Sequence, residues 1–142
     1  MAIDGEPSID SFMRAVASCF RAMADESELD VTFSAETPGV SGDRVRLPFP
    51  SRELPSGEVA QVRGEADALA LKMRHHDARL HSRRMPSGDV APVLFEMLEQ
   101  ARVEALGTRR MAGASENIAA ALELSLIPIS EPTRRYAISY AV

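Results

Sequence analysis

The sequence predicts a mainly α-helical fold in which four or five helices pack with one short β-hairpin. Apolar residues recur at steps of three and four over residues 9–23, 59–73 and 94–105, which is typical of one face of a helix. Apolar and polar residues alternate over 29–34 and 44–47, which indicates half-buried strands. Helical segments therefore dominate, with a small β element between the first two.

The first helix is expected to begin near Ser8 or Asp10, because either side chain can cap a helix N-terminus. Cys19, the one cysteine of the chain, lies within the apolar pattern of this helix. We interpret it as a small buried hydrophobe, with a reactive thiol as the alternative. The expected inward face consists of Ile9, Phe12, Met13, Val16, Phe20 and Met23.

The two strand-like segments are predicted to pair as a hairpin, with a turn at Thr37-Pro38-Gly39. Asp30 would then lie on the strand opposite Arg44 and Arg46. Because a two-stranded hairpin is only marginally stable in water, we expect it to pack against the helices.

The segment after Ser56 shows the most regular helical pattern, and its expected inward residues are Val59, Val62, Ala66, Leu69 and Met73. Gly64 lies in the middle of this pattern and costs about 1 kcal/mol relative to alanine in a helix interior. A close approach by another helix at Gly64 is the expected reason for the glycine. A last helix is predicted over about residues 115–123.

The fourth predicted helix follows Asp89 and ends near Gly107. Its expected inward stripe is Leu94, Met97, Leu98, Ala101 and Ala105, and its expected solvated face is Glu96, Glu99, Gln100, Arg102 and Glu104. Carboxylates on one face can perform acid–base chemistry, but local ion pairing is the plainer interpretation. A third use is partner binding, for which the candidate residues are Glu96, Glu99, Arg102, Arg109 and Arg110.

The composition limits the classes of partner. Sixteen basic and 21 acidic residues give a formal net charge of −5, which argues against nucleic acid as the partner. No apolar stretch reaches the length of a membrane span, and residues 1–7 lack the pattern of a signal peptide. We therefore expect a cytoplasmic protein with no membrane partner.

Catalytic and cofactor-binding motifs are not recognisable in the sequence. It contains no phosphate-binding G-x-x-x-x-G-K-[ST] loop, no G-x-S-x-G elbow and no paired cysteines for zinc. His76, Asp77 and His81 are weak candidates for metal ligands, since Asp77 and His81 are four residues apart and would share a helical face. Nearby arginines would repel a cation, so we favour a solvated polar segment and predict no metal site.

Several blocks of sequence resemble one known family. The most specific is LEQARVEALGTRRM at residues 98–111, and RGEADALALK at 63–72 is followed closely by His76-Asp77. Arg46-Leu47-Pro48 and LDVTF at 29–33 fit as well. In order and spacing, these blocks resemble the N-terminal region of CobT, a subunit of the aerobic, ATP-dependent cobaltochelatase.

The resemblance implies a scaffold or coupling role. The implied holoenzyme inserts cobalt into hydrogenobyrinic acid a,c-diamide during cobalamin biosynthesis, using ATP and magnesium. Its other parts would be an AAA+ ATPase subunit and a large macrocycle-binding subunit. No catalytic or cofactor-binding residue is implied for this segment, which is not expected to be catalytic alone. The alternatives are a small metal-binding or metal-delivery module and a generic helical protein-interaction domain.

The end of the chain departs from the family pattern. LSLIPISEPTRRYAISYAV, residues 124–142, resembles a translated sequencing-library adapter. We therefore expect three parts: a flexible N-terminus at 1–10, a CobT-like helical domain at 11–123 and a non-native tail at 124–142.

Overall fold

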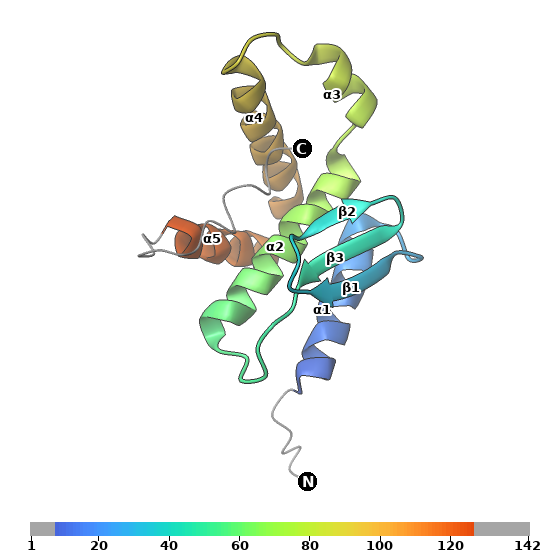
Figure 1. Ribbon diagram of the computed structural model, residues 1–142, viewed down its shortest axis with the longest axis vertical. Helices are drawn as coiled ribbons and strands as arrows, with labels where there is room; N and C mark the ends of the chain where they lie inside the picture. The colour runs from blue at the N-terminus through green and yellow to red at the C-terminus, as the bar shows by residue number, and fades with distance from the viewer. Residues whose placement is uncertain (1–7, 127–142) are drawn as a thin grey trace.

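The computed structural model describes residues 8–126, which form five helices and a small three-stranded sheet (Figure 1). In chain order the elements are α1 (Ile9–Ala24), β1 (Asp30–Ser34), β2 (Gly39–Ser41), β3 (Arg44–Pro48), α2 (Ser56–His75), α3 (Ala78–Arg84), α4 (Ala91–Thr108) and α5 (Ala112–Leu126). The predicted mainly α-helical fold is confirmed. None of the described helices is long and apolar enough to cross a membrane.

Helix α2 is the centre of the fold and contacts α1, α4, α5 and strand β3. The sheet and α1 lie on one side of α2, and α5 lies on the other (Figure 1). Because α2 has neighbours on several sides, its buried residues extend well beyond the one stripe that the sequence pattern predicts. The largest fully buried side chains include Phe20 of α1, Leu47 of β3 and Leu71 of α2.

The crossing of α2 and α5 explains Gly64. A Cβ atom at Gly64 would overlap the Ala121 side chain and the Asn117 carbonyl oxygen of α5, so the predicted close helix approach is confirmed. Beside it, Asn117 Nδ2 donates a 2.8 Å hydrogen bond to Asp67 Oδ2. Burial raises the pKa of Asp67, and this hydrogen bond partly opposes the rise.

The predicted hairpin is wrong in its strand pairing. The sheet order is β1-β3-β2, and β1 pairs with β3 in parallel, with Asp30 in register with Arg44. The antiparallel hairpin joins β2 to β3 through Gly42, whose φ of 62° suits the tight turn. The turn after β1 therefore leads into β2, a strand of three residues that is too short to show an alternating pattern in the sequence. Strand β2 pairs with β3 on the side opposite β1.

The first and last helices begin and end partly where the sequence predicted. Ser8 caps α1 as expected, because its side chain accepts a hydrogen bond from the Ser11 amide. Cys19 is exposed on α1, so its interpretation as a buried residue is wrong. Helix α5 is longer than predicted at both ends and continues to Leu126. The rest of the expected flexible N-terminus and of the expected non-native tail, residues 1–7 and 127–142, lies outside the described residues.

Candidate functional site

Helices α3 and α4 form an arm that extends from the C-terminal end of α2 and returns to it (Figure 1). We call residues 78–108 the α3–α4 arm. The chain leaves α2 at His76, whose backbone is extended, and Asp77 then caps α3 by accepting a 2.9 Å hydrogen bond from the Leu80 amide. The chain changes direction sharply here, so that His76, before Asp77, and His81, after it, both lie against α4.

His76 and Glu99 connect the end of α2 to the middle of α4. His76 Nδ1 lies 2.7 Å from Glu99 Oε1, and both side chains are mostly shielded from solvent. An ionised carboxylate can only accept hydrogen bonds, so Nδ1 of His76 carries the proton of this contact.

His81 makes the second connection, from α3 to α4. Its Nε2 lies 2.8 Å from Glu96 Oε1, and its side chain is only 9% exposed. The His81 ring stacks on Phe95 with centroids 4.7 Å apart, and it meets the His76 ring edge-on at 4.8 Å. These contacts fix the imidazole in position between the two helices.

Arg102 controls the charge of Glu99. Its Nε and one terminal nitrogen donate 2.7 Å hydrogen bonds to the two carboxylate oxygens, and the same terminal nitrogen donates to the His75 carbonyl oxygen. The hydrogen bond from Arg102 is the largest cause lowering the Glu99 pKa to about 2; burial opposes it and His76 adds to it. Glu99 is consequently ionised at neutral pH and is a poor general base.

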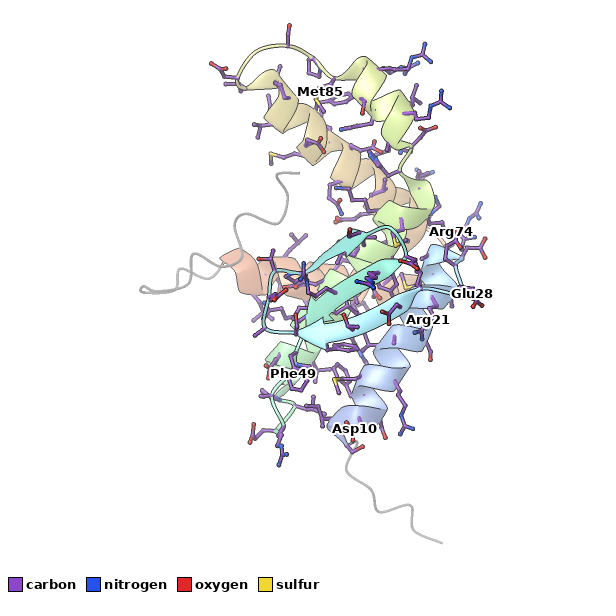
Figure 2. The ribbon with its side chains drawn as sticks, turned by 45° about the vertical axis from the view of Figure 1, so that its right-hand side comes forward. Asp10, Arg21, Glu28, Phe49, Arg74 and Met85 are labelled. Atoms are coloured by element: carbon purple, nitrogen blue, oxygen red, sulfur yellow. The ribbon has the colours of Figure 1, made fainter. Side chains whose placement is uncertain are left out.

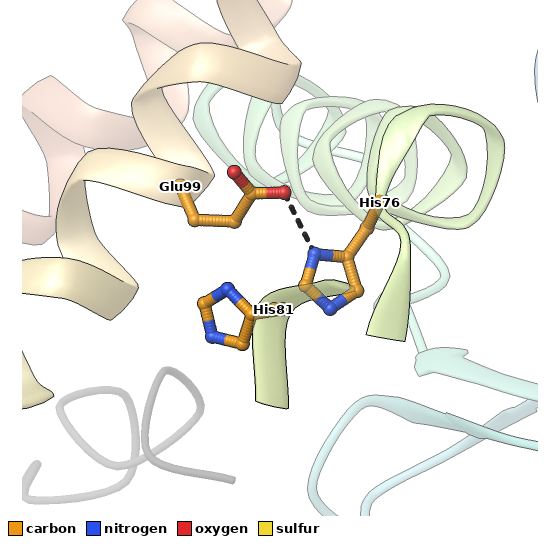
Figure 3. Close-up of side chains that lie close together, drawn as sticks. All are labelled: His76, His81 and Glu99. Atoms are coloured by element: carbon orange, nitrogen blue, oxygen red, sulfur yellow. Dashed lines mark hydrogen bonds and ion pairs between the residues drawn. The ribbon is translucent and has the colours of Figure 1, made fainter. Parts of the chain in front are cut away.

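The structure brings together two of the three weak metal candidates and replaces the third. His76, His81 and Glu99 each offer a ligand atom, and these atoms lie within 4.8 Å of one another (Figure 3). Asp77 instead caps α3 with its carboxylate. Sequence reasoning missed Glu99 as a possible ligand because that residue is remote in sequence and was assigned to the solvated face. The sequence did indicate one contact of Glu99, because Arg102 follows it by three residues and can form an ion pair with it on the same helix.

The predicted inward stripe of α4 is wrong. Leu94 is 53% exposed, Met97 61% and Leu98 69%, and Ala101 and Ala105 are exposed as well. The N-terminal half of α4 turns Glu96 and Glu99 toward His81 and His76, which leaves Leu94 and Leu98 on the outer side of the helix.

The C-terminal half of α4 provides its true buried contacts. Val103 is fully buried, and Gly107 packs so closely on Leu71 of α2 that a Cβ atom would overlap that side chain. Gly107 thus lies in the last turn of α4, one residue before the helix ends at Thr108, and the C-cap is Arg109 rather than the predicted Gly107. The helix is anchored to the body at its base, while its apolar stripe faces outward.

The residues predicted to bind partners divide into two groups. Arg102, Arg109 and Arg110 are exposed as expected, whereas Glu96 and Glu99 are partly buried against His81 and His76. The placement of those two glutamates on the outer face is therefore wrong, and the binding role of the whole set stays a prediction.

Comparisons with known proteins agree with the sequence blocks noted above. The model of one protein family, described as cobalamin biosynthesis protein CobT, matches residues 6–128. That range includes all the described helices and strands. No solved structure matches the chain.

Proposed function

The chain belongs to the CobT family of cobalamin biosynthesis proteins, and from that premise we propose that it is the scaffold and coupling region of a cobaltochelatase subunit. The proposed partners are an AAA+ ATPase subunit and a large subunit that binds the macrocycle. The proposed reaction of the assembly is ATP-dependent insertion of cobalt, as substrate, into hydrogenobyrinic acid a,c-diamide. In this proposal the region docks partners and does not itself perform the chemistry.

The observation that supports docking is the uncovered apolar face of α4. We define the α4 outer face as Val90, Val93, Leu94, Met97 and Leu98, each more than half exposed. These positions follow one another at steps of three, one, three and one, so they form a single stripe along the helix. Contiguous exposed apolar surface on a soluble domain is typical of a protein-interaction site.

The arm is also suited to transmit a displacement. Its base is fixed by the burial of Val103 and by the packing of Gly107 on Leu71 of α2, and its middle is tied to the end of α2 by Glu99 and Arg102. A partner seated on the α4 outer face would therefore push on the central helix of the fold rather than on a loose segment. This mechanical link supports coupling as the role of the region.

The ionisable groups of the arm are poorly arranged for catalysis. Glu99 has a pKa of about 2, which makes it a weak base, and both its oxygens accept hydrogen bonds from Arg102. Glu96 is engaged by His81. These pairings support a structural use of the carboxylates within the proposed scaffold.

Partner capture by the full-length protein tests this proposal. Leu94→Glu combined with Leu98→Glu should reduce co-purification of the ATPase or the large subunit by about tenfold or more, because charges in the centre of an apolar contact are costly to bury. The fold should persist, since both side chains are more than half exposed.

Phe49→Glu is the matched control, because Phe49 is an equally exposed apolar residue at the opposite end of the molecule from the arm (Figure 2). It should leave capture unchanged. Undiminished capture by the α4 double variant, with its helical circular dichroism intact, would show that the partners bind elsewhere.

A further inference from the structure

Two imidazoles and a carboxylate converge at the junction of α2, α3 and α4 (Figure 3). His76 comes from the end of α2, His81 from α3 and Glu99 from α4, so three separate elements supply the ligand atoms. The side chains are 16%, 9% and 14% exposed, respectively. Partial shielding of this kind reduces the competition of water for a bound ion while leaving a path for entry.

We propose that His76, His81 and Glu99 bind one divalent transition-metal ion of the class that prefers imidazole and carboxylate ligands, such as Zn²⁺. The docking role proposed above does not require an ion, so this inference stands independently of it. The sequence predicted no metal site, and this set differs from its weak candidates because Glu99 replaces Asp77 as the carboxylate.

The second contact of His81 supports this assignment. Its Nε2 faces Glu96, which leaves Nδ1 as the nitrogen available to an ion. Metal-binding histidines commonly donate the other ring N–H to a carboxylate, which fixes the tautomer and strengthens the ligand. Glu96 is placed to accept that hydrogen bond, and Phe95 holds the plane of the ring by stacking.

Binding one ion would require the three side chains to move toward a common centre. A tetrahedral ion with bonds of about 2.0–2.2 Å holds its ligand atoms about 3.3 Å apart. The three ligand atoms here lie within 4.8 Å of one another, and His76 Nδ1 and Glu99 Oε1 are 2.7 Å apart. An ion held by both atoms would displace the proton that His76 Nδ1 carries, widen the shorter distance by about 0.6 Å and draw His81 closer. Water would complete the coordination shell.

Arg102 is the main opposing charge. It binds both oxygens of Glu99, but its side chain is 49% exposed, so the guanidinium can move outward when an ion approaches. Its positive charge also predicts weaker binding than in zinc sites whose surroundings carry no cation.

Zinc titration of the full chain by calorimetry tests the site. We expect one ion per chain at neutral pH, and His76→Ala and His81→Ala should each weaken binding by about 100-fold or more because each removes a ligand. Glu96→Gln should weaken it by about 10–100-fold, as expected for a residue that orients a ligand. His75→Ala is the matched control and should bind zinc like the wild type, because His75 is outside the cluster.

A second measurement does not depend on whether the variants fold. In the wild-type chain, zinc should shift the imidazole nuclear magnetic resonance signals of His76 and His81 and leave those of His75 in place. The absence of any shift at millimolar zinc, or loss of binding in His75→Ala, would overturn the proposal. So would binding that Cys19→Ser abolishes, because it would place the ion on the exposed thiol of α1.

Discussion

In the body formed by α1, α2, α5 and the sheet, apolar side chains face inward, and Phe20 and Leu71 are almost fully buried. On α4 of the arm, Leu94 and Leu98 face outward, and in the N-terminal half of this helix Glu96 and Glu99 make the inward contacts, with His81 and His76. Both regions have amphipathic helical sequences. They differ in what lies beside each helix: α2 is surrounded by apolar neighbours, whereas the N-terminal half of α4 lies beside His76 and His81.

This difference shows what hydrophobic periodicity reports. It identifies which face of a helix is apolar, but it does not identify what covers that face. Where the neighbouring element belongs to the same apolar core, the face is buried, as for Val62 and Ala66. Where the neighbours are histidines that engage the glutamates of the helix, the apolar face stays exposed, as for Leu94 and Leu98.

The largest predicted contrast comes from making the same substitution in both regions. Leu71→Ala should lower the free energy of unfolding by about 2–5 kcal/mol, because it opens a cavity beneath Gly107. Leu98→Ala should change it by no more than about 0.5 kcal/mol, since that side chain is mostly in water. Urea denaturation of both variants checks this; similar losses would mean that the arm is packed against the body.

Glycine substitutions should show a smaller contrast within the body itself. Gly64→Ala should destabilise the fold by about 1–3 kcal/mol, because the new methyl group collides with Asn117 and Ala121 of α5. Gly113→Ala on α5 meets open space and should stabilise the helix by up to about 1 kcal/mol. Thermal melts of the two variants should move in opposite directions, and a shared direction would contradict the α2–α5 crossing.

The polar contacts of the arm should contribute less than the packing of the body. Glu99→Gln weakens the contacts with Arg102 and His76, and because Arg102 is half exposed we expect a loss of about 1 kcal/mol. The loss should be local. Hydrogen exchange should become faster in α3 and α4 and stay unchanged in α1, and a uniform increase in both regions would show that the arm does not open separately.

The smallest effects are expected in the pH dependence of stability. Glu99 in the arm and Asp67 in the body should change the free energy of unfolding in opposite directions as the pH falls. The Glu99 pKa is lowered from 4.5 to about 2, so its contribution to stability is present above pH 4.5 and is lost as the pH falls toward 2. The Asp67 pKa is raised from 3.8 by burial, so its contribution is present below pH 3.8 and is lost as the pH rises through the folded-state value.

Melting curves of Glu99→Gln and Asp67→Asn measure these two contributions. The stability that Glu99→Gln loses relative to the wild type should shrink as the pH falls. The stability of the wild type relative to Asp67→Asn should instead increase as the pH falls. Parallel pH profiles would contradict the assigned environments of the two carboxylates.

Much of the fold was predictable because local patterns dictate it. Periodicity located the helices, Ser8 marked the start of α1, and Gly64 indicated a helix crossing. The parallel pairing of β1 with β3 was not predictable, because strand direction depends on where the chain places β2.

The candidate site was predictable only in part. His76 and His81 are close in sequence and attracted attention as a cluster, but their partner Glu99 is brought to them by the return of α4 along the arm. Asp77 was only a weak candidate for a metal ligand, and its capping role appears only once α3 is seen to begin at Ala78. Contacts between elements, rather than patterns within them, decide such a site.

Hydrogen exchange of the full-length protein, alone and assembled with the ATPase and large subunits, tests whether α4 is the docking surface. If partners bind the α4 outer face, assembly should slow amide exchange across residues 90–98 while leaving exchange around Phe49 unchanged. Unchanged exchange in α4, with the assembly intact, would show that the partners bind another surface.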